Sequence, residues 1–122
     1  MRYVPSPREG QSDEAGQPGM LELFVEAGDR AVLDYVDNIA IAPNGHVIGC
    51  EDKQVGTQHV KGVTPDGRVY AIARNAMRHD ADESNTEFAG VCRAPDGRTM
   101  FVNLYSPGMT LAVTGPWDRF RV

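Results

Sequence analysis

Apolar and polar residues alternate at a period of two along much of the chain, a pattern typical of half-buried β-strands rather than helices. In the run Leu21–Glu26, every second residue from Leu21 onward is a leucine or a valine. Residues 5–19 are polar, rich in proline and glycine, and follow a short apolar start. The pattern therefore predicts an N-terminal strand, a long exposed hairpin loop and a second strand over Leu21–Glu26.

A tetrapeptide turn signal occurs three times, each time between two apolar runs. The copies are Ala42-Pro43-Asn44-Gly45, Thr64-Pro65-Asp66-Gly67 and Ala94-Pro95-Asp96-Gly97. Asn-Gly and Asp-Gly adopt positive φ at little steric cost, and the proline presets a turn, so each copy is suited to close a hairpin. The flanking runs predict six strands, at 38–41, 46–50, 60–63, 68–72, 89–92 and 99–104.

The first and third copies lie about fifty residues apart, which is the length of one four-stranded propeller blade. We therefore interpret the chain as all-β, with antiparallel hairpin repeats that form about two blades of a β-propeller. Residues 1–35 would end a preceding blade, 36–87 would form one blade plus a connection, and 88–122 an incomplete final blade with Met109–Val113 as its third strand. A small β-sandwich or barrel would show the same alternation. The open strand edges of a partial propeller favour self-association.

The formal net charge of −5 restricts the partners, because an acidic surface repels nucleic-acid phosphates. No apolar run is long enough to span a bilayer, and the first residues lack an export signal. We therefore expect no nucleic-acid or membrane partner, and a cytoplasmic location for the chain expressed as given. Cys50 and Cys92 lack a zinc or disulfide spacing and are expected to be buried in strands, and Trp117 is expected to anchor packing.

Side chains with oxygen donors gather at the ends of the predicted strands, namely Asp37, Asn38, Glu51, Asp52 and Glu87. In a propeller, the inner strands of successive blades point corresponding ends toward one channel, where Asp37, Asn38 and Glu87 would converge. Calcium takes its ligands from carboxylate and amide oxygens of this kind. The residues alone also fit an interpretation without a metal site, in which Asp37-Asn38 forms a turn and Glu51-Asp52 forms a solvated loop.

Several runs occur in an order that resembles the C-terminal region of the PhoX-like alkaline phosphatases. They are Asp37-Asn38-Ile39-Ala40-Ile41-Ala42-Pro43-Asn44-Gly45, Cys50-Glu51-Asp52, residues 62–70, Glu87-Phe88-Ala89-Gly90, residues 95–103 and residues 107–117. The likeness extends from Tyr3 to Trp117. A single Pro-Asp-Gly is common, but the ordered set is specific.

This resemblance implies a six-bladed propeller with an active site in its channel. It also implies calcium and iron as cofactors, phosphate monoesters as substrates, and a periplasmic or secreted location. Carried over residue by residue, it assigns a metal-ligand role first to Glu87 and Glu51, and then to Asp37, Asn38 and Asp52. It assigns no catalytic residue.

The chain corresponds to only the last part of such an enzyme, so we expect it to be inactive alone. Two alternative functions stay open at this point. The chain could be a non-catalytic propeller remnant that acts as an interaction module, or part of a calcium-dependent lactonase-like propeller.

Overall fold

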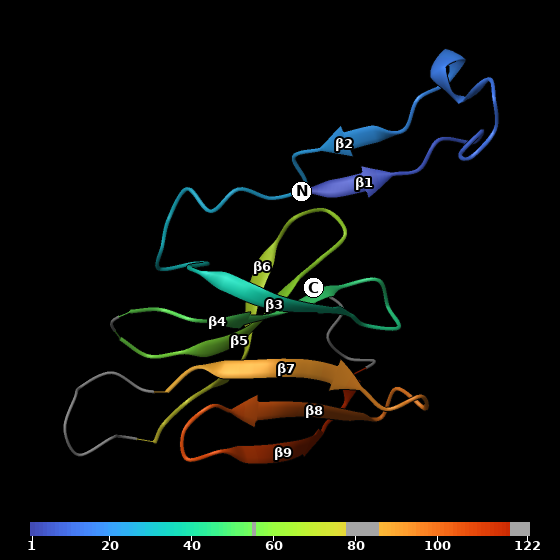
Figure 1. Cartoon of the computed structure of the whole chain (residues 1–122). Helices are drawn as coiled ribbons and strands as arrows, with labels where there is room; N and C mark the ends of the chain where they lie inside the picture. Colours follow the sequence, from blue (N-terminus) through green and yellow to red (C-terminus); the bar gives the residue numbers. More distant parts are fainter. Residues whose placement is uncertain (55, 78–85, 118–122) are drawn as a thin grey trace.

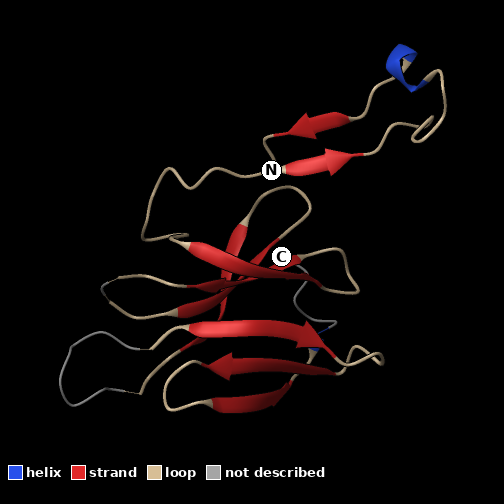
Figure 2. Cartoon of the chain, viewed as in Figure 1, coloured by secondary structure: helices blue, strands red, loops and turns tan. Residues whose placement is uncertain are grey.

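The computed structural model describes residues 1–54, 56–77 and 86–117, which form antiparallel β-sheets and one short 3-10 helix, Glu14–Gly16 (Figures 1 and 2). A two-stranded sheet pairs β1 (Arg2–Val4) with β2 (Met20–Glu22). A four-stranded sheet has the order β3 (Val36–Ile41), β4 (Val47–Glu51), β5 (His59–Val63) and β6 (Val69–Arg74). A three-stranded sheet has the order β7 (Phe88–Arg93), β8 (Thr99–Leu104) and β9 (Met109–Thr114). The all-β prediction is confirmed, and within the described residues no sheet closes into a barrel.

The three repeated turns close the β3–β4, β5–β6 and β7–β8 hairpins, as the sequence predicts. In the first, the amide of Ala42 donates to the carbonyl of His46 at 2.8 Å, and Gly45 has a φ of 81°. Residues with a side chain rarely adopt that φ, so the backbone conformation at this position favours glycine. The six strands flanking the turns, and the later strand β9, all form within a few residues of their predicted bounds.

The N-terminal hairpin forms, but the strand predicted over Leu21–Glu26 ends at Glu22. The reason is a lack of partners, because β1 pairs only through residues 2–4 and Arg2 lies opposite Glu22. Beyond that point Leu23 is 64% exposed. The hairpin extends away from the two larger sheets (Figure 1), and β1 and β2 pack mainly against each other.

The hydrophobic core lies between the four-stranded and the three-stranded sheet, where β7 packs against β3 and β4 (Figure 1). Its buried members are Ala42, Ile48, Cys50 and Val60 from one sheet and Phe88, Val91, Met100, Val102 and Leu104 from the other. Trp117 packs against this core, and the guanidinium of Arg93 lies 4.1 Å from its ring centre. The expectation that Trp117 anchors packing is therefore confirmed.

Cys50 is fully buried as predicted, but the prediction for Cys92 is wrong because Cys92 is exposed. The cause is a β-bulge, where the β7–β8 register shifts between Ala89 and Cys92. An extra residue in a strand changes which side chains face inward, and Val91 takes the buried position.

Strands β3 and β7 run side by side in the same direction, so that their first residues lie at one end of the sheet pair (Figure 1). The described strands that lie at sheet edges include β3, β6, β7 and β9. No helix among the described residues has the length and apolar character needed to cross a membrane.

Replacing Ile48 tests the placement of the core. Ile48 is 1% exposed, so Ile48→Ala is expected to lower the free energy of unfolding by about 3 kcal/mol through lost burial and the cavity left behind. Ile41 is 64% exposed, and Ile41→Ala is expected to lower it by less than about 1 kcal/mol. Urea denaturation of both variants measures the difference. Equal losses would contradict the assignment of Ile48 to the core and of Ile41 to the surface.

Candidate metal centre

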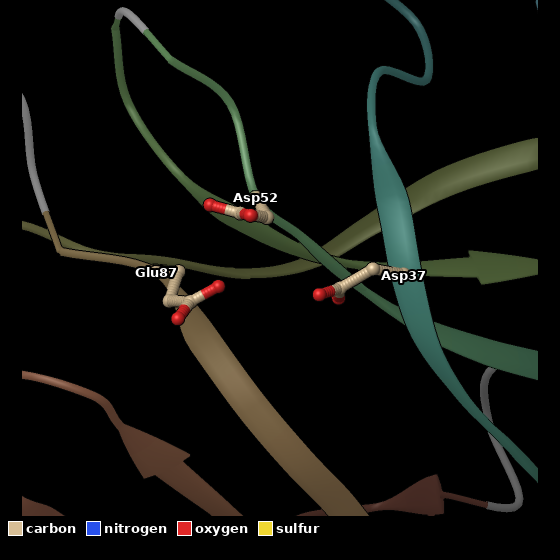
Figure 3. Close-up of side chains that lie close together, drawn as sticks. All are labelled: Asp37, Asp52 and Glu87. Carbon is tan, nitrogen blue, oxygen red and sulfur yellow. The ribbon is translucent and has the colours of Figure 1, made fainter.

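Three carboxylates from separate segments meet at the end of the sheet pair where β3 and β7 begin. Asp37 lies in β3, Asp52 directly follows β4, and Glu87 directly precedes β7. One oxygen from each lies within 4.8 Å of the other two. Figure 3 shows the side chains of Asp37 and Glu87 reaching toward each other, with Asp52 on a third stretch of ribbon. We call these three residues the acidic cluster.

A β-bulge in β3 gives Asp37 its position. Val36 pairs with Glu51 and Asn38 with Cys50, so β3 advances by two residues while β4 advances by one. Asp37 is the extra residue, and its side chain is exposed instead of lying over a partner on β4.

Backbone pairing beyond the strands holds Asp52 beside Asp37. The amide of Asp52 donates to the carbonyl of Tyr35 at 2.9 Å, which extends the β3–β4 pairing past Glu51. Tyr35 has a φ of 45°, an uncommon conformation for a residue other than glycine. The chain therefore turns sharply just before the strand that carries Asp37.

Glu87 is held by the residues on either side of it. Phe88 is 3% exposed and fixes the start of β7 in the core. The side-chain amide of Asn75 donates to the carbonyl of Thr86 at 2.7 Å, and the hydroxyl of Thr86 accepts from the amide of Ser106 at 2.8 Å. Glu87 itself accepts from the amide of Tyr105 through its carbonyl. These contacts position a half-buried carboxyl group without using its oxygens.

The electrostatics of the acidic cluster favour a proton or a cation. Partial burial raises the pKa of Glu87 above its ordinary value, and Asp52 and then Asp37 raise it further. Asp52 raises the pKa both through its charge and as a hydrogen-bond partner of the protonated Glu87, because two carboxyl groups can share a hydrogen bond only when one of them carries a proton. Carboxylates this close repel one another when all are ionised, so a bound cation would relieve the repulsion.

Glu51, a predicted ligand, lies on the other side of the chain from its neighbour Asp52 and is fully buried. One of its oxygens lies 2.9 Å from both the ammonium of Lys53 and Nδ1 of His59. The other accepts from the amide of Asp34 at 3.2 Å. The structure therefore places Glu51 in a buried charge network beside the acidic cluster and not among its three members.

Asn38, also a predicted ligand, points toward β7. Its Oδ1 accepts from the amide of Val91 at 2.9 Å. Sequence reasoning found Asn38 but not this partner, which lies 53 residues away. It also missed His59 and Lys53. One usable signal existed for His59, because antiparallel pairing of Cys50 with Val60 brings Glu51 close to the preceding residue of β5.

Comparison with known proteins assigns the family. A family model described as alkaline phosphatase PhoX matches residues 2–108. The chain belongs to the PhoX family. The match contains all three members of the acidic cluster, whereas strand β9 lies just beyond it. No curated protein and no solved structure matches the chain.

The PhoX family suggests metal dependence, and the acidic cluster offers donors that suit a hard cation. Within the part of the chain that the structure describes, the group contains carboxylates and no histidine or cysteine. The nearby thiol of Cys50 is buried, which raises its pKa to about 11. It is therefore protonated at neutral pH and a poor metal ligand in that form.

The Glu51 network makes a prediction about stability. Glu51→Ala is expected to lower the free energy of unfolding by about 3 kcal/mol, because it leaves Lys53 and His59 without their buried partner. The matched control is Glu22→Ala, which breaks an exposed ion pair with Arg2 and is expected to cost less than about 1 kcal/mol. Chemical denaturation of both variants in EDTA measures the two losses. A loss at Glu51 no larger than the loss at Glu22 would contradict the assigned network.

The raised pKa of Glu87 makes a prediction about pH. The native state binds this proton more tightly than the unfolded chain, so the carboxyl group lowers stability as pH rises above its ordinary pKa of 4.5. In EDTA, Glu87→Gln should remove this loss, and its stability relative to the wild type should increase from about pH 4.5 toward neutrality. Urea denaturation across that range measures it.

The matched control for this pH series is Asp96→Asn, which changes an exposed carboxyl group in the β7–β8 turn. Asp96 lies at the other end of β7 from the acidic cluster, so this variant should retain the loss of stability that Glu87 causes as pH rises. A Glu87→Gln variant with an unchanged slope would show that the acidic cluster does not act on the Glu87 carboxyl as described.

Proposed function

We propose that the acidic cluster is part of a calcium centre that serves the hydrolysis of phosphate monoesters. One observation carries the proposal: Asp37, Asp52 and Glu87 come from two different sheets and meet within 4.8 Å, inside the segment that matches the PhoX family. Repulsion among three carboxylates opposes such an arrangement unless a cation or a proton occupies it. The family membership supports the proposed substrate class, and the proximity of the three carboxylates supports the proposed position of the centre.

Calcium in proteins takes about six to eight oxygen ligands. Three carboxylates supply only part of that number, so the remaining ligands would come from water, from the substrate phosphate or from other protein segments. The described residues therefore support a shared centre of modest affinity in this chain. Iron is the second metal that the resemblance implies. We propose that it belongs to the same centre, and we assign none of the described residues to it.

A bound cation would neutralise charge on the phosphate group and polarise it toward attack. The protein residues have simpler roles. Asp37, Asp52 and Glu87 would bind the cation and orient it at the open end of the sheet pair. Glu51 is proposed to support this end from inside, because its buried contacts with Lys53 and His59 hold the chain just before Asp52.

The two larger sheets are proposed to be successive blades of a propeller, with β3 and β7 as the innermost strands. The same turn type joins β3 to β4 and β7 to β8, and both sheets continue outward in chain order, which supports the proposal. Residues 36–87 would then form one blade with its connection, 88–122 an incomplete blade, and 1–35 the end of a preceding one. Self-association through the edge strands is part of this proposal.

Thermal melts test the calcium centre. Millimolar calcium, compared with EDTA, is expected to raise the melting temperature of the chain by about ten degrees if its concentration is about a hundred times the dissociation constant. Glu87→Gln should lose most of this shift because it removes a charged ligand. Asp96→Asn should keep it, because Asp96 lies in the turn at the other end of β7. Absence of a shift in the wild type would mean that the chain does not assemble the centre and would favour a non-catalytic remnant.

Hydrolysis of p-nitrophenyl phosphate, assayed with and without calcium, tests the substrate class. The chain alone is proposed to bind calcium with little turnover, because the described ligands are only part of a full set. Any calcium-dependent hydrolysis should disappear in Glu87→Gln and persist in Asp96→Asn. Turnover of a lactone without turnover of the phosphate ester would favour the lactonase-like alternative.

A further inference from the structure

We propose that Asn38 positions the acidic cluster, by joining the two sheets through its hydrogen bond to the amide of Val91. The expected effect on calcium binding rests on the proposed function, but the link between the two sheets does not depend on calcium. Asn38 would act through Asp37, its neighbour in β3, and through Glu87, which lies four residues before Val91. It is a positioning residue in this proposal and not a ligand.

The donor becomes available because β7 contains a bulge. Ala89 pairs with Asn103 and Cys92 with Phe101, so β7 advances by three residues while β8 advances by two. Gly90 has a φ of 63° within this bulge. The amide of Val91 is thereby free to donate to the Oδ1 of Asn38 on the other sheet, at 2.9 Å.

The acceptor sits directly after a second bulge, the one that presents Asp37 from β3. Asn38 alternates with Asp37, so its half-buried side chain faces β7 while that of Asp37 is exposed. Cys50 of β4 pairs with Asn38, and burial raises the pKa of its thiol while the Val91 amide lowers it in part, so the sulfur is a second possible acceptor. Thiol sulfur is a weak acceptor, so the amide oxygen of Asn38 is the stronger partner.

The hydrophobic effect is not directional, so a directional contact adds a constraint on how the two sheets sit together. Val91 and Cys50 belong to the core between the sheets. The hydrogen bond from Val91 to Asn38 limits how far β7 can slide along β3, and so limits the separation of Asp37 from Glu87. A neutral amide also accepts this bond without adding a fourth negative charge beside the acidic cluster.

The test uses one variant on each side of the bond. Asn38→Leu keeps the approximate shape and removes the acceptor. Gly90→Ala perturbs the donor, because a Cβ at this positive φ would lie 2.6 Å from Nδ2 of Asn103. Val102→Ala is the control, because Val102 is buried in β8 opposite the bulge, and its truncation lowers stability while leaving both the donor and the acceptor of the bond in place.

Two measurements are made on each variant below its melting range. In EDTA, hydrogen exchange of the Val91 amide should speed up about tenfold in Asn38→Leu and in Gly90→Ala. In Val102→Ala it should speed up only as much as the lower global stability of that variant explains. Calcium titration calorimetry should show affinity weakened about tenfold in the first two variants, as when partners that orient metal ligands are removed, and unchanged in Val102→Ala. The double variant should lose little more than either single one, because both remove the same bond.

Losses of affinity that add in the double variant, or an unchanged affinity after Gly90→Ala, would overturn the positioning role and favour Asn38 as a direct ligand. Exchange of the Val91 amide that is unchanged by Asn38→Leu would overturn the bond itself.

The hydrogen-exchange measurement needs no calcium, so it separates failure of this inference from failure of the proposed function. No calcium binding in the wild type, together with Val91 exchange that speeds up in Asn38→Leu as expected, would reject the calcium centre alone. Val91 exchange at the same rate in Asn38→Leu and the wild type would reject the joining of the sheets by Asn38, whatever calcium does.

Discussion

The packing of β7 against β3 and β4 is the contact on which the rest of the structure depends. It buries Val91 and Phe88 against residues of the four-stranded sheet and so creates the core. The same contact brings together Asp37 and Glu87, which are far apart along the chain. The apolar core and the acidic cluster are two ends of one interface, so stability and the candidate chemistry share a single physical origin.

The two ends of this interface have opposite effects on stability. Burial of apolar side chains draws the sheets together, whereas the carboxylates at the open end repel each other. Partial burial, and then this repulsion, raise the pKa of Glu87. The repulsion is tolerated because Asp37 and Asp52 are exposed to water and the core is continuous. A local conflict of this kind, held in place by the surrounding fold, is typical of a functional site.

Glu51 and Asp52 show how one strand end gives neighbouring carboxylates different roles. Successive residues of a strand point to opposite faces, so Glu51 enters the interior while Asp52 reaches the open end. Inside, the ammonium of Lys53 compensates the charge of Glu51, and Nδ1 of His59 lies 2.9 Å from the same oxygen. A buried charge without such partners would be unstable. A shift by one residue would exchange the two roles, which explains why the bulge at Asp37 and the register of β4 matter to the site.

Local chemistry was enough to predict the hairpins, because proline followed by Asn-Gly or Asp-Gly constrains the backbone within four residues. It also identified Asp37, Asp52 and Glu87 as oxygen donors at strand ends. Tertiary structure alone decided that β2 stops at Glu22, that Cys92 is exposed, and that Asn38 bonds to Val91. Strand ends depend on available partners, bulges change which residues face inward, and contacts between sheets join residues whose spacing along the chain carries no signal.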